Sequence, residues 1–306
     1  MRKQLLSSAL ILVVLAALFL WAPGVYSNES VLFQLMVYLA LAQGINILYG
    51  FTGYLPFGYV GFFGIGAYGM SVFVTLFHVP IVVGILLGGL TAIVAGIILS
   101  PLLRLSGAYF SIGSLAASQI LYYVVSNSSL QNVTNGPYGV NLISIFNDAQ
   151  SYDAMLVVVL LTTAFVAYLR LSRFGKSLLA IREDWVSAEM AGIPVVRTRI
   201  LVWLAAALIA GLVGAVYAWH ISVFYPESVF SLPISIFAIV FTLFGGGATV
   251  IGPIIGTFIL YGMYNVIGVS EPQYFQLIYG VLIMALVLFL PRGLMSLFRR
   301  RGIRGA

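Results

Sequence analysis

The sequence predicts an all-α integral membrane protein with about ten transmembrane helices. Of its 306 residues, 62% are hydrophobic and only 7% are charged, so the chain carries more apolar side chain than a soluble fold of this length buries. Its apolar runs approach or reach the ~20 residues that a helix needs to cross ~30 Å of hydrocarbon. Helices are expected because lipid offers the backbone no hydrogen-bond partner and the runs lack the alternation of a barrel strand.

Ten apolar runs are candidate spans: Leu5–Trp21, Val31–Tyr49, Gly58–Phe77, Ile81–Ser100, Gly107–Ser126, Ala154–Leu169, Ile200–Trp219, Leu232–Gly247, Pro253–Gly268 and Tyr274–Leu290. The first resembles a secretory signal, but no small-x-small cleavage site follows it, so a retained helix is expected. Residues 245–253 (GGGATVIGP) lie between two short runs, which are either a re-entrant pair or two spans joined by a turn.

The basic residues predict the orientation of these spans. If the amino terminus is inside, all 14 lie on the inner side: Arg2, Lys3, Arg104, Arg170, Arg173, Lys176, Arg182, Arg197, Arg199, Arg292, Arg299, Arg300, Arg301 and Arg304. The outer loops hold Glu29, Asp148, Asp153, Glu227 and Glu271, and the N-x-S/T sequons at Asn28, Asn127 and Asn132. The sequence therefore predicts a multi-pass protein with both termini in the cytoplasm and a basic cytoplasmic tail, 292–306.

Composition also excludes several kinds of site. The chain has no cysteine, so a thiolate metal site or nucleophile is excluded, and no metal or cofactor is expected. The basic residues lie at membrane borders, which argues against binding of nucleic acid. None of the ten spans contains Asp, Glu, Lys or Arg, unlike ion-coupled transporters and intramembrane proteases. His78 and His220 fall at outer ends of spans, and His220 beside Trp219 is best explained as an interfacial residue.

One polar segment, 170–199, interrupts this apolar chain and holds nine of its charged residues. Asp184 is placed to cap a short helix, Gly192 to end it in a left-handed turn, and Pro194 to prevent its continuation. A preceding amphipathic turn, 176–182, would join it at Glu183–Asp184. Two such helices form a docking shape; the alternative is a basic tether at the lipid headgroups.

Within this segment, Gly175–Lys176–Ser177 reads like the end of a phosphate-binding loop. The earlier glycine that such a loop requires would occupy the position of Arg170, and an apolar membrane helix precedes it instead of a buried strand. The chain is therefore not expected to be an enzyme or to have an ATPase site of its own.

The stretch GKSLLAIREDWVSAEMAGIP, 175–194, resembles the cytoplasmic loop of permease subunits of branched-chain amino acid ABC importers, of the LivM/LivH type. The likeness extends from about residue 39 to 294 and includes GINILYGFTGYLPFGYVGFFGIGAYG from Gly44, LFGGGATVIGPIIG from Leu243 and FLPRGL from Phe289. This chain departs from the family pattern at Pro56–Phe57–Gly58–Tyr59 and at Thr134 (TNGPYG), which leaves the exact substrate open.

The resemblance implies that the 170–199 loop is a coupling element that sits in a cleft of an ATPase subunit. The matching positions are Gly175, Lys176, Leu178, Ala180, Ile181, Arg182, Glu183, Asp184, Ala188, Glu189, Gly192 and Ile193. Apolar contacts with the ATPase are expected from Leu179, Ile181, Trp185 and Met190, while the charges set register. The implied partners are two ATP-binding cassette subunits, a second homologous permease and an extracytoplasmic solute-binding protein, at the cytoplasmic (inner) membrane.

Two glycine-rich regions are candidates for the translocation pathway, namely Gly58, Gly61, Gly64 and Gly66 in one half and Gly245, Gly246 and Gly247 in the other. Close packing of helices is the simpler explanation of such glycines, as in the row Ala207, Gly211 and Ala215. The two halves could form an inverted repeat, which their sequence similarity alone does not establish.

Together these features predict one permease domain, 1–306, that moves branched-chain amino acids with energy from separate ATPase subunits. A permease of the same superfamily for urea, amides, a sugar or another small polar solute is the near alternative. A stand-alone secondary carrier or channel is a more distant one, and a pure scaffold is the third.

Overall fold

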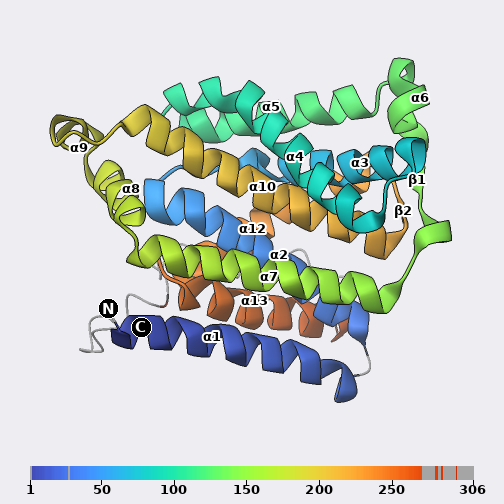
Figure 1. Cartoon of the computed structure of the whole chain (residues 1–306), viewed down its shortest axis with the longest axis horizontal. Coiled ribbons are helices and arrows are strands. Elements are labelled where there is room, and N and C mark those ends of the chain that lie inside the picture. The colour runs from blue at the N-terminus through green and yellow to red at the C-terminus, as the bar shows by residue number, and fades with distance from the viewer. Residues whose placement is uncertain (1, 27, 271–279, 282–283, 285–293, 295–306) are drawn as a thin grey trace.

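The computed structural model describes residues 2–26, 28–270, 280, 281, 284 and 294, which form a bundle of long helices (Figure 1). The long helices are α1 (Arg2–Trp21), α2 (Glu29–Ile45), α3 (Val60–Phe77), α4 (Ile81–Leu99), α5 (Gly107–Val125), α7 (Asp148–Leu171), α10 (Val195–Ile221), α12 (Leu232–Gly245) and α13 (Ile251–Ser270). Seven helical segments of the described part are long and apolar enough to cross a membrane, and shorter apolar helices lie at Ser8–Gly24 and Ile251–Val266.

The predicted all-α membrane fold is therefore confirmed, and the predicted number of ten spans is approximate. Nine of the ten predicted spans correspond to helices of the described part of the chain. The tenth, Tyr274–Leu290, and the basic tail 292–306 lie almost wholly outside the described residues.

The bundle has two distinct ends (Figure 1). One end carries α8 (Arg173–Glu183), α9 (Trp185–Met190) and the start of α1, and we call it the α8–α9 end. The opposite end, the β1–β2 end, carries α6 (Gln131–Thr134), β1 (Val140–Asn141) and β2 (Val223–Phe224). The segment predicted to be polar and cytoplasmic is thus well separated from the segments predicted to lie outside.

Two helices, α7 and α10, begin a full turn or more before their apolar runs. α7 starts at Asp148 instead of Ala154, because the side chain of Asn147 caps it by accepting a hydrogen bond from the N–H of Gln150 at 3.1 Å. α10 starts at Val195 instead of Ile200, directly after Pro194. Hydrophobicity thus predicted where the apolar part of each helix begins, whereas Asn147 and Pro194 mark where the helices themselves begin.

Small residues let the central helices approach closely, as predicted. α3, α4 and α10 pack together, and a methyl group on Gly66 would lie 2.1 Å from the carbonyl oxygen of Gly211. A methyl group on Gly214 would lie 1.9 Å from the carbonyl oxygen of Phe63. Ala207 and Ala215 are both fully buried. The row Ala207, Gly211 and Ala215 therefore packs helix against helix.

The chain between α2 and α3 is interrupted inside the bundle. α2 ends in a π-helical turn, Asn46–Gly50, and a 3-10 turn, Phe57–Tyr59, precedes α3. Between the two turns the chain is pinned to α5, because the hydroxyl of Ser111 donates to the carbonyl of Leu55 at 2.8 Å. α3 therefore begins among the side chains of neighbouring helices, a feature that the apolar pattern did not predict.

The α12–α13 pair is a helical hairpin, and residues 246–250 are its turn. The two helices run antiparallel in close contact, since a methyl group on Gly245 would lie 1.9 Å from the carbonyl oxygen of Gly252, and one on Gly256 would lie 2.1 Å from that of Phe241. Gly246 has φ +105° and Ala248 has φ +61°, so the turn itself uses left-handed backbone.

At the β1–β2 end, two connections are paired. β1 and β2 are antiparallel, with Val140 opposite Phe224 and Asn141 opposite Val223. Trp219 extends the contact by donating from Nε1 to the carbonyl oxygen of Ile145 at 2.8 Å. The α5–α7 connection, expected to be a polar outer loop, is therefore an ordered cap joined to the segment that follows α10, and α11 (Pro226–Val229) continues that segment into α12.

Candidate functional site

The α8–α9 loop begins at a tight bend. Ser172 caps α8, and its side chain accepts a hydrogen bond from the N–H of Gly175 at 3.0 Å. Gly175 lies against the last turn of α7, where a methyl group would be 1.7 Å from the carbonyl oxygen of Leu169. The bend between α7 and α8 thus requires glycine at position 175. Sequence reasoning singled out Gly175 but not this cause, because its contact is with backbone of the preceding helix.

The predicted boundaries of α9 are confirmed. The carboxylate of Asp184 accepts a hydrogen bond from the N–H of Val186 at 3.0 Å and another from the hydroxyl of Ser187. These two donors hold the pKa of the Asp184 carboxyl below its ordinary value. Gly192 has φ +84°, and α10 starts immediately after Pro194. Local capping therefore shapes the loop as two short helices joined at Glu183–Asp184.

The twelve predicted coupling positions divide between an inner and an outer surface. Gly175, Leu178, Ile181 and Ala188 are buried, Ile193 is half-buried, and Lys176, Ala180, Arg182, Glu183, Asp184, Glu189 and Gly192 are exposed. Ile181, 3% exposed, packs with Ala188 and Val195. This differs from the expectation that Ile181 is presented to a partner: it is part of the small core that holds the loop together.

The outer surface of α9 is apolar and uncovered. Trp185 is 51% exposed, Val186 is 46% exposed and Met190 is 86% exposed. The carboxylates of Glu183 and Glu189 flank them and are exposed as well. We call these five residues the α9 face. An aromatic residue and a methionine flanked by charge are typical of a protein interface. The helix that carries them, α9, lies at the very end of the bundle (Figure 1).

The side chain of Arg182, although exposed along part of its length, reaches back to the end of α2. Its guanidinium donates a hydrogen bond to the carbonyl oxygen of Gly50 and lies 5.9 Å from the centroid of the Tyr49 ring. Gly50 is the last residue of the π-helical turn of α2. The loop is therefore attached to the point where α2 breaks, although Arg182 was expected to set register with a partner.

Arg199 makes a second contact of this kind. Its guanidinium lies 5.2 Å from the centroid of the Tyr54 ring and 6.0 Å from that of Trp185. Tyr54 follows the π-helical turn, and its hydroxyl donates to the carbonyl of Leu103 at 3.2 Å. Arg182 and Arg199 of the polar segment therefore both contact residues 49–54. Trp185, which belongs to the α9 face, lies beside Arg199 and so connects that face to this contact.

Two buried amides connect the π-helical turn to the α12–α13 turn. The side chain of Asn46 accepts a hydrogen bond from the N–H of Ala248 at 2.7 Å and donates to the carbonyl of Thr249 at 2.7 Å. Gln43 donates to the carbonyl of Val250 at 2.8 Å. Both amides are fully buried. A continuous series of contacts therefore runs from α8 through the end of α2 to the 246–250 turn.

Sequence reasoning missed this series. A signal was present, because Gln43 and Asn46 are amides inside an apolar run, and buried polar side chains need partners. Which partners they have could not be read from the sequence. The residues that they contact are more than 200 positions away along the chain.

Six of the seven glycines predicted to line a pathway lie at close contacts, and the seventh, Gly246, lies in a turn. A methyl group on Gly58 would be 1.8 Å from the carbonyl oxygen of Ser114, and one on Gly64 would be 2.5 Å from the ring of Phe230. Gly61 faces Ser118, and Gly66 faces Gly211. In the other half, Gly245 faces Gly252, Gly246 lies in the turn with positive φ, and Gly247 faces Gly50. They pack helices and turns in this conformation, and their role in a pathway stays a prediction.

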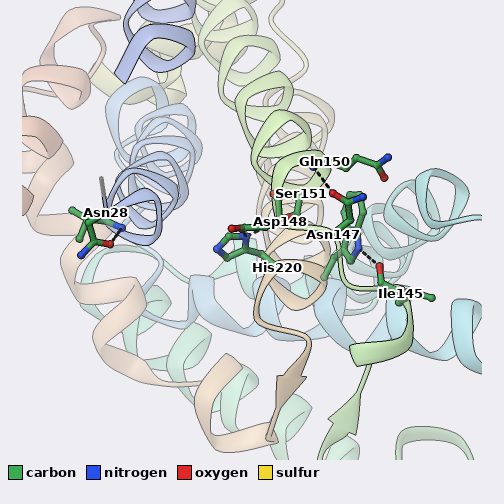
Figure 2. Close-up of polar contacts among 9 residues, drawn as sticks. Asn28, Ile145, Asn147, Asp148, Gln150, Ser151 and His220 are labelled. Carbon is green, nitrogen blue, oxygen red and sulfur yellow. Dashed lines mark hydrogen bonds and ion pairs between the residues drawn. The ribbon is translucent and has the colours of Figure 1, made fainter. Parts of the chain in front are cut away.

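A polar cluster closes the opposite end of the bundle (Figure 2). His220 Nδ1 lies 2.9 Å from the hydroxyl of Ser151 and 3.2 Å from the carboxylate of Asp148, and its ring stacks on Phe33 with centroids 3.5 Å apart. Both polar contacts use the same ring nitrogen, so this is not the relay of a hydrolytic triad, which uses one nitrogen for each partner. The cluster joins α7, α10 and α2 at their ends.

Two of the three sequon asparagines also cap helical turns at that end. The side chain of Asn28 accepts a hydrogen bond from the N–H of Val31 at 3.3 Å at the start of α2 (Figure 2), and that of Asn127 accepts one from the N–H of Ser129 at 2.8 Å. Their side chains are therefore used in local structure.

Known proteins are similar to this chain over most of its length. High-affinity branched-chain amino acid transport system permease protein LivM of Salmonella typhimurium is 26% identical over 331 residues, which cover 97% of this chain and 76% of LivM. LivM of Escherichia coli gives the same identity and coverage, 26%, 97% and 76%. L-arabinose ABC transporter permease protein AraH of Azospirillum brasilense is 25% identical over 216 residues, 67% of this chain and 62% of AraH.

A family match covers most of the chain. The family described as branched-chain amino acid transport system / permease component matches residues 27–287, from the start of α2 to beyond α13. That range contains the α8–α9 loop, both interrupted segments and the α12–α13 turn. The chain is a multi-pass membrane protein of the ABC-transporter permease type and belongs to this branched-chain amino acid permease family.

Proposed function

We propose that this chain is a transmembrane subunit of an ATP-driven importer for branched-chain amino acids, coupled to separate ATPase subunits through the 170–199 loop. The observation that carries the proposal is the α9 face. It is the uncovered apolar surface of a loop whose other side is attached, through Arg182, to the break in α2. The two LivM relatives, matched over 97% of this chain, support branched-chain amino acids as the solute.

Energy from ATP would enter at the α9 face. Trp185, Val186 and Met190 would insert into a cleft of the ATPase, and Glu183 and Glu189 would select register at its rim. Closure of two ATPase subunits would push α8 and α9 as a unit, since their shared core includes Ile181 and Ala188. The chain then needs neither a coupling ion nor a catalytic group of its own.

The push would reach the membrane helices through residues 49–54. Arg182 and Arg199 hold this segment, and Asn46 joins it to the 246–250 turn. A displacement of α8 would thus move the end of α2 and the α12–α13 hairpin together. Both segments are interrupted, which is where transporter helices change conformation.

The proposed setting follows from charge and from the two ends of the bundle. The α8–α9 end would face the cytoplasm, with both termini there, because it carries the basic residues of the 170–199 segment and the remaining basic residues are predicted on the same side. The β1–β2 end would face outward and receive a solute-binding protein, and a second homologous permease would pair with this chain. The cytoplasmic membrane is the location that this assembly requires.

A sugar is the second candidate solute, because AraH, named as a permease for L-arabinose, also matches this chain. The coupling mechanism is the same for either solute. Uptake assays with both classes of solute separate the two.

The experiment that tests the coupling role compares exposed apolar residues at the two ends. Met190→Glu alters the α9 face, and Tyr138→Glu is its control, since Tyr138 is 66% exposed at the β1–β2 end. Met190→Glu should abolish co-purification of the ATPase subunits and ATP-dependent uptake, while Tyr138→Glu should retain co-purification. Glu189→Lys should also stop accumulation without removing the protein from the membrane. Normal uptake by Met190→Glu and Glu189→Lys would refute the coupling role of this loop.

A further inference from the structure

Hydroxyl side chains line one contact surface between α3 and α5. On α5 they recur every fourth residue and so share one helix face. On α3, Gly61 lies against α5, while Gly64 and Tyr68, further along the same helix, lie against the ring of Phe230. We call the whole surface the α3–α5 seam, and it consists of Ser114, Ser118 and Tyr122 of α5 with Gly61, Gly64 and Tyr68 of α3.

Gly61 brings the two helices close together at Ser118. A methyl group on Gly61 would lie 3.2 Å from Cβ of Ser118. Further along, Tyr68 and Tyr122 both flank the ring of Phe230, with centroid distances of 6.4 Å and 6.0 Å. The seam is therefore a polar strip between two apolar helices.

Two hydroxyls of the seam are buried and have no hydrogen-bond partner. Tyr68 is 2% exposed and Ser118 is 1% exposed, and neither Tyr68 Oη nor Ser118 Oγ makes a hydrogen bond. In the described part of the chain, the same holds for only two other side-chain atoms, Thr163 Oγ1 and Arg199 Nε. Buried polar atoms are almost always paired in folded proteins, and an apolar side chain would serve packing better. Two such atoms on one surface indicate that a partner binds there in another state.

The inner end of the seam is the amino terminus of α3. The N–H of Gly58 donates to the hydroxyl of Ser114 at 3.2 Å, and the N–H of Val60 donates to that of Ser235 at 2.7 Å. Inside the bundle, only side chains from neighbouring helices can satisfy these donors. The amino terminus of a helix favours negative charge, and serine oxygens from α5 and α12 occupy the places where an anionic oxygen would bind.

Phe230 closes the other end. Its ring lies against Gly64, where a methyl group would be 2.5 Å away, and it stands at the joint between α11 and α12. α11 follows directly from the β1–β2 pair. A shift of this joint would withdraw the ring and expose the seam toward the β1–β2 end.

We propose that the α3–α5 seam is the solute-binding site, and that it takes a small α-amino acid whose carboxylate lies at the amino terminus of α3. Ser118 and Tyr68 supply the hydrogen bonds that the polar end of the solute loses on leaving water, and Phe230 excludes the solute in the conformation described. A carboxylate is favoured over a neutral sugar because the donors are backbone N–H groups at the positive end of a helix. This inference rests on the proposed function, since it places the solute of that permease.

Ser118→Ala and Tyr68→Phe test the site, because the atoms that they remove make no hydrogen bond within the protein. Neither variant should lower the melting temperature of the full complex. With the complex reconstituted in lipid vesicles, each should raise the KM for leucine uptake by about tenfold, the effect of losing one buried hydrogen bond. Thr163→Val is the matched control, since it removes a buried unpartnered hydroxyl from α7 and should leave the KM unchanged.

Competition with solute analogues tests the carboxylate. Leucine should compete with labelled leucine far better than its decarboxylated amine does, and better than L-arabinose. Wild-type uptake that requires ATP, together with unchanged KM in Ser118→Ala and Tyr68→Phe, would overturn this inference and leave the proposed function intact. Equal competition by the amine, or stronger competition by L-arabinose, would overturn the placement of a carboxylate at α3. A wild-type complex without ATP-dependent uptake would overturn the proposed function itself.

Discussion

Arg182 donates a hydrogen bond to the carbonyl oxygen of Gly50, and this contact ties α8 to the last residue of the π-helical turn of α2. The two residues are 132 positions apart in the sequence. One belongs to the polar loop and the other to an apolar helix, so the hydrogen bond crosses the border between the surface that would receive an ATPase and the helices that would carry solute.

Removal of this contact should separate docking from transport. Arg182→Ala should retain association with the ATPase subunits, because the α9 face is unchanged, but should lower ATP-dependent uptake by about tenfold, the effect of losing a charge-assisted hydrogen bond. Arg173→Ala is the control, since Arg173 is exposed in the same helix. Co-purification and vesicle uptake measure the two properties. Full uptake by Arg182→Ala would show that the contact transmits nothing.

Asn46 should be a determinant of stability as well as a link. Asn46→Ala leaves the N–H of Ala248 and the carbonyl of Thr249 without their partner, at a cost of about 2–3 kcal/mol in the free energy of unfolding. Asn265→Ala should cost less, because the amide of Asn265 donates to the carbonyl of Tyr261, one turn back in its own helix, and does not join distant segments. Thermal unfolding in detergent compares the two. Equal melting temperatures would contradict the assigned role of Asn46.

Gly175 should tolerate no side chain. Gly175→Ala places a methyl group 1.7 Å from the carbonyl oxygen of Leu169, so the α7–α8 bend must open, at a cost of about 1–3 kcal/mol. The variant should expose the loop to protease and weaken ATPase binding. Gly24→Ala, where nothing lies within 4 Å, should be indistinguishable from the wild type. A Gly175→Ala protein with wild-type protease resistance would refute the explanation of this glycine.

The cap of α9 should depend on pH in one direction. The pKa of the Asp184 carboxyl is lowered from its ordinary value of 3.8, so its contribution is complete above pH 3.8 and is lost as the pH falls through the lower folded value. The Val186 amide should therefore lose its protection from hydrogen exchange only in strong acid. Asp184→Asn keeps an acceptor that does not titrate, and its protection should be independent of pH. A loss of wild-type protection near neutral pH would show that another group controls the cap.

The sequence was sufficient for features whose causes are local. The start of α9 at Asp184, its end at Gly192 and the break at Pro194 were all predicted, because capping and left-handed turns depend on a few adjacent residues. Apolar runs located the helices, because the lipid imposes their length. The same reasoning underestimated the lengths of α7 and α10, because their first turns are polar and lie outside the apolar runs.

Features that depend on distant partners were not predictable. Arg182 was expected at a protein interface because its segment resembles a coupling loop, and nothing in the sequence indicated that its guanidinium also donates to the carbonyl of Gly50 in the π-helical turn. The predicted spans Val31–Tyr49 and Gly58–Phe77 left a break between α2 and α3, but the apolar pattern could not show that this break holds a π-helical turn and lies inside the bundle. Ser114 and Ser235 became interpretable only when the structure placed them at the start of α3.

The pairing of β1 with β2 fixes the geometry of any rearrangement. It ties the segment before α7 to the segment after α10, so these helices cannot separate freely at that end. α10 has 27 residues and is therefore ~40 Å long. A tilt of ~10° about the paired end would carry its opposite end by ~7 Å, more than one helical turn. A small rotation of α10 about the paired strands would therefore produce its largest displacement at the other end of the helix, where α8 and α9 are attached.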